Sequence, residues 1–434
     1  MKKRVVVSGI GAVTPIGVGI NKFWEACVNG ISGVREITSF DASAYPTRIA
    51  AEVKLQDFDP KDYAEDDEMM ERMGKSVQFA TAAAQIAMAD CGANTGKLDP
   101  ARTGVVLGVT EDSDYLHGLT PIVLQAATRE NGQKELDLKK YVEYSRSAPM
   151  ARGRFFTSIP DFITTKIATR YHIQGPCCSV NTACATGSQA IGEAYRMIER
   201  RDADFIICGG TQALGGPITL LLFSLLNVIS RNNAEPQKAS RPFDAHRDGF
   251  VLGEGAGILI LEGLEHALRR NAKIYGEVAG FGTSCDAYRV TDEPPDGRGA
   301  IASMRNALAD AGISPIEVNY INAHGTSTPL NDRVETLAIK AVFGEYAHKI
   351  PVSSTKSMIG HLIAGAGAVE LITCLLAIVH GIIPPTINYE YRDPHCDLDY
   401  VPNASRKASV DIALSNSFGF GGQNTSLIVR KFAE

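Results

Sequence analysis

The cysteine at position 184 stands where an extended segment passes into a helix, a place that could make it a nucleophile. Residues 179–188 read Ser-Val-Asn-Thr-Ala-Cys-Ala-Thr-Gly-Ser, and apolar residues then recur over residues 185–199 at the spacing of one helical face. The unpaired N–H groups and positive dipole of a helix N-terminus favour the thiolate, which is the nucleophilic form. Cysteine is also among the residues most often simply buried, so Cys184 alone leaves a catalytic and a structural interpretation open.

Two histidines lie in comparable places. His324 follows a predicted strand over residues 318–323, and His361 follows a strand over residues 351–354 and opens a helix. A helix N-terminus disfavours protonation of His361, so its ring would present a neutral N–H donor. Either histidine alone is more often structural than catalytic, and Lys356 alone is more typical of an exposed charge.

The elements that must position these residues repeat after about residue 272. The first half reads as a strand with a glycine-rich turn (5–17), a helix (77–91), a strand (103–109), the strand, turn and helix around Cys184, a strand (203–210) and a glycine-rich strand (249–262). The second half repeats this order with residues 274–282, 300–311, 318–323, the turn around His361, a helix over 364–380 and a last strand with glycines at 418–422. The apolar stretch 217–229 is expected to be buried.

This repetition predicts an α/β protein with two similar halves, residues 1–272 and 273–434, and mostly buried sheets. If the halves pair about a pseudo-twofold axis, the turns around Cys184 and His361 are equivalent and meet near the centre. The glycines at 419–422 either form a bulge or expose a backbone N–H for an oxyanion hole.

Composition limits the function classes. The 434 residues are 44% hydrophobic and 21% charged with a net charge of −6, and there is no block of lysine or arginine, so nothing favours nucleic acid. No apolar run approaches the ~20 residues of a membrane span. Glycines interrupt the apolar N-terminus before it reaches signal-peptide length, so a cytoplasmic protein is expected.

The chemistry-bearing residues favour neither a metal nor a nicotinamide cofactor. The nine cysteines form no disulfide framework and no paired zinc motif. The turn at residues 9–14 lacks the third glycine of a dinucleotide fingerprint, because Thr14 stands there, and Pro15 interrupts the helix that would receive the pyrophosphate.

Several motifs together resemble the β-ketoacyl-acyl-carrier-protein synthases of the elongating type. The resemblance covers nearly the whole chain and rests on residues 182–187 (TACATG), 241–244 (RPFD), 247–255 (RDGFVLGEG), 322–328 (NAHGTST), 354–361 (STKSMIGH) and 416–422 (NSFGFGG). It implies the thiolase fold, five layers of helix and sheet built from two duplicated halves.

The resemblance also implies the roles of single residues. Cys184 would accept the acyl group from an acyl-carrier thioester, and His324 and His361 would bind the malonyl thioester carbonyl during decarboxylation. The resulting enolate would attack the acyl group on Cys184. The backbone N–H groups of Cys184 and Phe420 would form the oxyanion hole, and Phe420 would gate the acyl pocket.

Support and partners follow in the same way. Lys356 would pair with Glu370 behind the histidine site, and no cofactor would be needed, because decarboxylation supplies the carbanion. The expected product is a 3-oxoacyl-acyl-carrier protein plus CO2, in fatty-acid, polyketide or specialised lipid biosynthesis. The partner would be an acyl carrier protein loaded with acyl or malonyl groups, and the chain would form dimers, as a homodimer or a heterodimer.

Close relatives differ at the same positions. A degradative thiolase would carry a second catalytic cysteine in the loop over residues 419–424, and chain-initiating synthases have asparagine at the position of His361. The alternative function is a structural or chain-length-setting partner of a heterodimeric ketosynthase. The intact Cys184, His324 and His361 argue against this alternative.

Three departures from the family pattern concern the docking surface, the region 111–154 and the C-terminal glycine loop. Residues 65–71 are acidic where the family has basic residues that face the acidic carrier, and Asn227 stands where an arginine is usual. The region 111–154 is longer than expected and is predicted to be partly helical. Gln423 replaces the usual threonine after the paired glycines.

Overall fold

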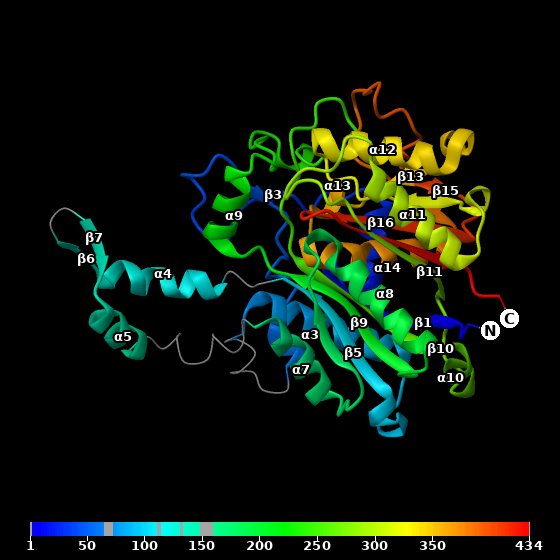
Figure 1. The fold of residues 1–434 in the computed structure, drawn as a ribbon, viewed down its shortest axis with the longest axis horizontal. Coiled ribbons are helices and arrows are strands. Elements are labelled where there is room, and N and C mark those ends of the chain that lie inside the picture. The colour runs from blue at the N-terminus through cyan, green and yellow to red at the C-terminus, as the bar shows by residue number, and fades with distance from the viewer. Residues whose placement is uncertain (1, 65–72, 111–113, 131–132, 148–158, 434) are drawn as a thin grey trace.

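The computed structural model describes residues 2–64, 73–110, 114–130, 133–147 and 159–433. Helices and sheet alternate in five layers (Figure 1). The first half of the chain supplies one half-sheet and its helices: β1 (Val5–Thr14), β5 (Thr103–Val109), β8 (Cys177–Val180), β9 (Phe205–Gln212), β10 (Gly255–Gly263), α3 (Lys75–Cys91), α7 (Pro160–Arg170) and α8 (Thr186–Glu199). The second half supplies the other: β11 (Gly276–Cys285), β12 (Tyr320–Asn322), β13 (Val352–Ser353), β16 (Ile412–Gly419), β17 (Gln423–Arg430), α11 (Arg298–Ala311), α12 (Pro329–Phe343), α13 (Lys356–Ile359) and α14 (Ala366–His380).

The order of the strands shows the predicted duplication directly. Across the sheet it runs β13-β12-β16-β17-β11-β1-β10-β9-β5-β8, so each half gives the same order outward from the centre. The pairing directions also match, because the two inner pairs of each half are antiparallel and the two outer pairs are parallel. Backbone pairing of β1 with β11, from Val5 opposite Val278 to Val7 opposite Gly276, joins the halves.

The predicted glycine-rich turn after residue 8 is wrong, because β1 continues to Thr14. A Cβ atom at Gly9 would lie 2.5 Å from the Ala87 carbonyl oxygen of α3, and one at Gly11 would lie 2.1 Å from that of Ala83. These glycines therefore let a helix backbone lie directly on the strand. Gly280 and Gly282 of β11 do the same for α11, which explains why the motif recurs.

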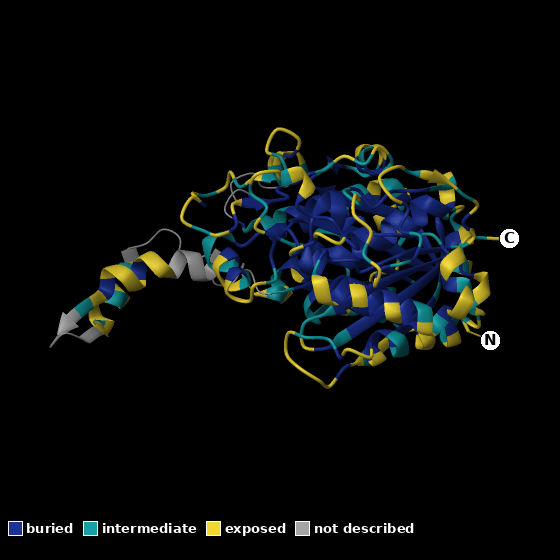
Figure 2. Ribbon diagram, turned by 90° about the horizontal axis from the view of Figure 1, so that it is seen from above, coloured by how far each residue is buried: buried dark blue, intermediate teal, exposed yellow. Residues whose placement is uncertain are grey.

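The core lies between the half-sheets, where buried residues fill the interior (Figure 2). Helices α8 and α14 form this middle layer, α3 and α7 cover one outer face, and α11 and α12 lie beyond the other. The helical stretch Ile363–His380 is apolar and long enough to cross a membrane, but 89% of it is buried inside the fold, so it is the central core helix. The smaller elements are β2 (Gly17–Val18), α1 (Ile20–Val28), β3 (Arg35–Glu36), β4 (Ile49–Ala50), α10 (Leu264–Arg269), β14 (Ile382–Ile383) and β15 (Arg406–Lys407).

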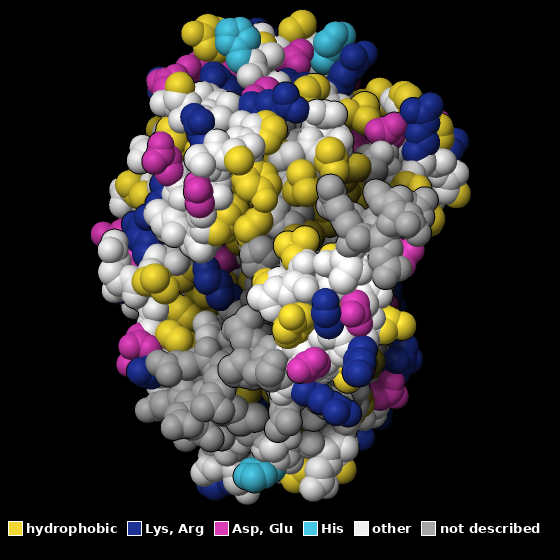
Figure 3. Space-filling view, turned by 90° about the vertical axis from the view of Figure 1, so that its left-hand side faces the viewer, with side chains coloured by type: hydrophobic (Ala, Val, Ile, Leu, Met, Phe, Trp, Pro, Cys, Tyr) yellow, Lys and Arg dark blue, Asp and Glu magenta, His cyan; other side chains and the backbone are white. Residues whose placement is uncertain are grey.

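The expectation that residues 217–229 are buried is wrong in large part. Helix α9 (Gly216–Leu225) lies at the surface, where Leu222 is 55% and Leu225 is 68% exposed. An unbroken apolar run has no polar face from which its orientation could be read. Figure 3 shows hydrophobic side chains gathered on this end of the molecule.

An arm projects from the same end (Figure 1). It contains α4 (Asp114–Ala126), the hairpin of β6 (Ala127–Glu130) and β7 (Gln133–Leu136), and α5 (Leu138–Ser147). The helices confirm the partly helical region expected over 111–154, whereas the hairpin was not foreseen. The acidic segment 65–71 lies outside the described residues.

Candidate active site

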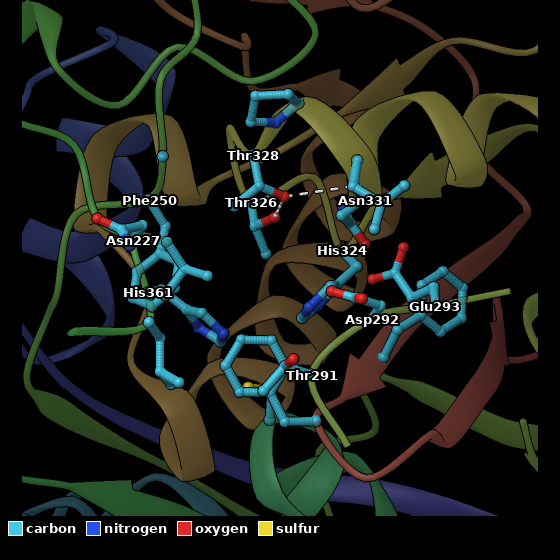
Figure 4. Close-up of a pocket in the computed structure, with 18 of the residues that line it drawn as sticks. Asn227, Phe250, Thr291, Asp292, Glu293, His324, Thr326, Thr328, Asn331 and His361 are labelled. Carbon is cyan, nitrogen blue, oxygen red and sulfur yellow. Dashed lines mark hydrogen bonds between the residues drawn. The ribbon is translucent and has the colours of Figure 1, made fainter. Parts of the chain in front are cut away.

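One cavity of about 290 Å³ is lined by Cys184, His324, His361 and Phe420, so the side chains that the sequence singled out meet at one place (Figure 4). They come from four separate turns: one in each of the two strand–turn–helix repeats, and two in loops that follow strands β12 and β16. Lys356 and Glu370 are buried behind the cavity wall rather than in its lining.

The turn that carries Cys184 is a short 3-10 helix, Ala183–Ala185, placed between β8 and α8. Its entry is tight, because Ala183 has a φ of 48°. The Thr182 N–H donates to Thr186 Oγ1 at 2.8 Å, and the Ala185 N–H donates to the Thr182 carbonyl at 3.0 Å. These bonds fix the thiol at the floor of the cavity.

The expectation of a readily formed Cys184 thiolate is wrong for the free protein. Only 6% of the residue is exposed, and burial raises the pKa of its thiol to about 11. The Phe420 backbone N–H and the charge of Lys356 favour the thiolate and lower this pKa, but they do not outweigh burial. Cys184 is therefore a protonated thiol at neutral pH until substrate or base assists its ionisation.

His361 is held by the backbone on both sides. Its N–H donates to the Val251 carbonyl at 2.7 Å, and its own carbonyl accepts from Gly253 N–H at 3.0 Å. Its Nδ1 atom accepts from Ile363 N–H at 3.2 Å, which leaves the proton of the neutral ring on Nε2. Nε2 is buried and has no hydrogen-bond partner among the described residues, so it is a donor available to substrate.

His324 is positioned by a buried carboxyl group on α12. Glu335 accepts the backbone N–H groups of His324 at 2.9 Å and Gly325 at 2.8 Å. Lys356 Nζ lies 3.4 Å from His324 Nδ1, an arrangement that also favours the tautomer with its proton on Nε2.

The two imidazoles lie together in this arrangement, with ring centroids 5.4 Å apart and planes at 84°. Burial lowers the pKa of both rings well below the usual value, with the charge of Lys356 as the next cause. Two neutral N–H donors therefore face one cavity.

Lys356 and Glu370 form a buried ion pair, as the resemblance implied. Lys356 opens α13 and Glu370 lies on α14, so the pair joins the two elements on either side of the His361 turn. Both residues are at most 1% exposed. Removing either residue of this buried ion pair should destabilise the protein, because the other charge would then be buried without a partner.

Phe420 lies in the loop between β16 and β17. Its backbone N–H points toward the Cys184 sulfur, so this donor lies beside the atom to which an acyl group would be attached. The loop approaches closely because a Cβ atom at Gly419 would lie 2.7 Å from the Thr182 carbonyl oxygen. The Gly421 N–H donates to the Val290 carbonyl at 2.6 Å, which ties this loop to residues 286–297.

Several lining residues received no role from the sequence. Thr326 and Thr328 lie within the recognised motif over 322–328, and their hydroxyls are 2.9 Å apart. The Asn331 N–H donates to Thr328 Oγ1 at 3.3 Å. Because Thr326 and Thr328 belong to this motif, the sequence could have indicated that they line the site. Glu293 and Phe250 also line the cavity, and no pattern in the sequence marked Glu293.

The structure shows the contacts of Asn227 and Gln423, two of the residues that depart from the family pattern. Asn227 lines the cavity and adopts a left-handed φ of 56°, and its side-chain oxygen accepts from the Arg231 guanidinium at 2.7 Å. A cation thus stands four residues beyond the position where the resemblance leads us to expect an arginine. Gln423 opens β17 opposite Gly419. Among the described residues no three His, Cys, Asp or Glu side chains gather to hold a metal ion.

Comparison with known families and proteins agrees with this geometry. The sequence matches the beta-ketoacyl synthase N-terminal domain over residues 2–267 and the C-terminal domain over residues 275–390. A 3-oxoacyl-[acyl-carrier-protein] synthase 2 of Coxiella burnetii is 44% identical over 99% of each chain, and that of Synechocystis is 45% identical over 99% of each. A putative polyketide beta-ketoacyl synthase 1 of Streptomyces cyaneus is 40% identical over 99% of this chain and 98% of its own.

Solved structures show the same likeness. The ishigamide ketosynthase/chain length factor superposes with a TM-score of 0.87 at 34% identity and covers 100% of both chains. A type II polyketide acyl-carrier protein in complex with its ketosynthase gives a TM-score of 0.86 at 34% identity, again over 100% of both chains. The expected thiolase fold is confirmed.

Proposed function

Because the chain belongs to the β-ketoacyl synthase family, we propose that it condenses an acyl thioester with malonyl-acyl-carrier protein and releases CO2. It is an acyltransferase of the 3-oxoacyl-acyl-carrier-protein synthase type, acting in fatty-acid or polyketide biosynthesis. The observation that carries the proposal is that a thiol, two neutral imidazole donors and a backbone N–H line one cavity.

The first half-reaction loads the thiol. The Cys184 sulfur attacks the acyl thioester carbonyl, the carrier thiol leaves with the cysteine proton, and an acyl-enzyme forms. The N–H groups of Cys184 and Phe420 stabilise the tetrahedral oxyanion, and a single such donor is worth about 3 kcal/mol. The orientation of the Phe420 N–H toward the sulfur supports this role.

The second half-reaction makes the carbon nucleophile. The Nε2–H groups of His324 and His361 donate to the malonyl thioester carbonyl, which becomes an enolate oxygen as the carboxylate leaves as CO2. The enolate carbon attacks the acyl carbonyl on Cys184, the C–S bond breaks, and the sulfur takes up one proton. Neutral imidazoles suit this step, because they stabilise a developing anion without delivering a full charge to the substrate carboxylate.

Lys356 and Glu370 act as positioning residues for this site. Lys356 Nζ points at His324 Nδ1 and is held by Glu370, so the pair fixes the tautomer and orientation of the ring. Lys356 also lowers the pKa of both histidines.

The partner is an acyl carrier protein in acyl-loaded and malonyl-loaded forms. A relative of the same fold is known in complex with its acyl-carrier protein, which supports this assignment. The cavity mouth carries Asn227 and, hydrogen-bonded to it, the exposed Arg231. We propose that Arg231 replaces the usual arginine in meeting the acidic carrier.

We further propose a homodimer in the cytoplasm, with a heterodimer as the alternative, and a boundary between the halves at residues 272 and 273. Strand β8 is the last strand of the sheet, and an edge strand presents backbone groups to which another strand can pair. The projecting arm of α4 and α5 leaves Leu124 66% and Leu138 69% exposed, as for surface that a second copy covers. Sedimentation equilibrium of the purified chain tests this assembly.

The alternative function, a non-catalytic partner of another synthase, would require a site that cannot catalyse condensation. The geometry described here favours catalysis. Copurification with a second synthase, together with inactivity of the isolated chain, would favour the alternative instead.

Intact-protein mass spectrometry tests the function. The chain is incubated with acyl carriers that bear acyl groups of different length, and malonyl-carrier is then added. A mass increase that maps to Cys184 and disappears on addition of malonyl-carrier is the expected result. A Cys285→Ser variant, which removes an exposed thiol, should behave like the wild type. Acylation elsewhere, or an acyl group that malonyl-carrier does not discharge, would contradict the proposal.

A further inference from the structure

A carboxylic acid that the reaction scheme does not use lines the same cavity. Glu293 lies in the segment 286–297 between β11 and α11, with Thr291 and Asp292 beside it. In Figure 4 it stands on the His324 side, across the cavity from His361. The presence of its charge raises the pKa of the Cys184 thiol, so it is close enough to the reacting sulfur to matter electrostatically.

Glu293 has an unpaired oxygen in acidic surroundings. The residue is half-buried, its Oε2 atom is shielded from solvent, and that atom has no hydrogen-bond partner in the described part of the chain. The charges that face it are those of Asp286 and Asp292 on its own segment and Asp332 and Glu335 on α12.

Burial, helped by these four carboxylates, raises the pKa of Glu293 to about 8. The group is therefore mainly an uncharged acid at neutral pH. A buried O–H donor without a protein acceptor has to find one in what the cavity binds.

We propose that Glu293, in its un-ionised form, donates a hydrogen bond to the free carboxylate of the malonyl group and so selects a carboxylated extender unit. This inference rests on the proposed function. The malonyl carboxylate is two bonds from the thioester carbonyl carbon, whose oxygen His324 and His361 receive, so it stays within the cavity that Glu293 also lines, on the His324 side. An O–H to carboxylate bond is charge-assisted and strong, whereas an ionised Glu293 would repel the same anion.

The effect should fall on binding rather than on the chemical step. As CO2 leaves, the negative charge moves from the carboxylate to the enolate oxygen between the histidines, and the bond to Glu293 weakens. A contact that is strongest in the ground state lowers KM for malonyl-carrier without raising kcat. Glu293 is thus a substrate-binding residue that discriminates between malonyl and acetyl groups.

Calorimetric titration with two inert ligands tests this inference without turnover. The probes are amide-linked malonyl-pantetheine and amide-linked acetyl-pantetheine, titrated into the wild-type chain near pH 6.5 and near pH 9, about one unit or more on either side of the Glu293 pKa. The malonyl probe should bind roughly tenfold more weakly at the higher pH, in proportion to the ionised fraction, and the acetyl probe should be unaffected.

Two variants separate the hydrogen bond from the charge. Glu293→Gln keeps a neutral donor and cannot ionise, so at both pH values its affinity for the malonyl probe should stay near that of the wild type at the lower pH. Glu293→Ala lacks the donor and should bind the malonyl probe about fivefold to tenfold more weakly at the lower pH. In steady-state assays at the lower pH, Glu293→Ala should raise KM for malonyl-carrier, Glu293→Gln should keep KM near the wild-type value, and both should leave kcat within about twofold.

Asp292→Asn is the matched control, because it removes a carboxylate one residue away that also lines the cavity. It should keep a pH-dependent malonyl affinity, because burial is the main cause of the raised Glu293 pKa, with a midpoint slightly below that of the wild type, because one of the four carboxylates is gone. Glu335, whose pKa burial raises to about 7, is the other facing group that titrates in this interval, and any slope left in Glu293→Gln belongs to it.

Three results would overturn the inference: equal malonyl affinity of the wild type at both pH values, wild-type affinity in Glu293→Ala, or no binding of the malonyl probe at all. A condensation assay on the wild type runs in parallel. Absent condensation with intact pH-dependent binding would refute the proposed function and leave the role of Glu293 standing.

Discussion

The two central turns of this molecule share a backbone and differ in chemistry. The turn Ala183–Ala185 leads into α8, and the turn Ile363–Gly365 leads into α14. Each turn begins with a non-glycine residue of positive φ, 48° at Ala183 and 43° at Ile363. The residue that follows is Cys184, the proposed nucleophile, in the first half and Ala364 in the second.

The second half uses its turn differently. The residues just before it carry His361, and the ion pair of Lys356 and Glu370 brackets it. Duplication thus supplied a rigid symmetric frame, and a few side chains on either side of the axis divide the reaction into acyl transfer and decarboxylation. If this division is correct, variants in one half should spare the partial reaction of the other.

The largest expected effect is that of Cys184→Ala, which removes the nucleophile. Condensation and acylation should both fall by about 10⁴-fold or more, because no other group can form the acyl-enzyme. The fold should persist, since alanine is what the second half carries at the equivalent position. Mass spectrometry and far-ultraviolet circular dichroism check the two statements.

An Ala364→Cys substitution in that variant sharpens the test. Ala364 is fully buried and its carbonyl lies against the backbone of Gly187 and Gly210, so the new thiol should stay inert and cost about 1–3 kcal/mol of stability through overpacking. Acylation at position 364 would show that the frame, rather than the side chains around Cys184, confers reactivity.

The next largest effect is expected from His324→Ala and His361→Ala. Each removes one donor to the enolate oxygen and should lower malonyl-carrier decarboxylation by about 10²-fold to 10³-fold. Transfer of the acyl group to Cys184 should continue, because it uses donors from Cys184 and Phe420. Equal loss of both partial reactions would break the division between the halves.

Lys356→Met is expected to act mainly on stability. It leaves the Glu370 carboxylate buried without its partner, and such a change costs about 3 kcal/mol. Urea denaturation measures this loss. The double variant Lys356→Met with Glu370→Leu should recover a large part of the stability while decarboxylation stays impaired; if the double variant is no more stable than the single one, the two residues do not act as a pair.

The smallest effect concerns pH. His361 is buried with a pKa well below its ordinary value of 6.5, so in acid the unfolded chain binds a proton that the folded chain excludes. The stability due to neutral His361 is present above pH 6.5 and is lost as the pH falls, by up to about 1.4 kcal/mol per unit.

His361→Gln keeps an N–H donor without a titrating ring. The wild type should therefore lose stability relative to this variant below pH 6.5, which urea titrations at several pH values would detect. Comparing the two proteins separates the contribution of His361 from that of buried carboxyls such as Glu335. Because the pKa of Glu335 is raised, its contribution to stability decreases with increasing pH, opposite to that of His361. Parallel curves for the two proteins would mean that His361 is protonated in the folded state.

Periodicity and motif spacing predicted most of the frame and the central site. The strand over 103–109 was placed to the residue, and the helices over 77–91 and 364–380 were placed to within two residues of their observed starts. The turn at Gly9 and Gly11 was misread, because a glycine that permits close packing of a helix looks like one that permits a turn.

What the sequence could not supply depends on neighbours distant along the chain. The orientation of α9, the high pKa of Cys184 and the tautomer of His324 all follow from tertiary contacts, whereas the tautomer of His361 is set locally by the Ile363 N–H and agrees with the neutral donor expected from the sequence. Glu293 belongs to no motif and is recognisable only once its unpaired oxygen is seen in the cavity.

The backbone pairing of β1 with β11 has a mechanical consequence. The two halves belong to one continuous sheet, so a hinge opening between them would have to break the backbone pairing of β1 with β11. The distance between Cys184 and the two histidines is therefore expected to stay constant, because one continuous sheet carries both sides of the site. The loops at 286–297 and 419–423, which contribute Glu293 and Phe420 to the cavity lining, are joined by backbone hydrogen bonds from Gly421 N–H to the Val290 carbonyl and from Asp286 N–H to the Gly422 carbonyl, so any movement at this side of the cavity is expected to involve both loops.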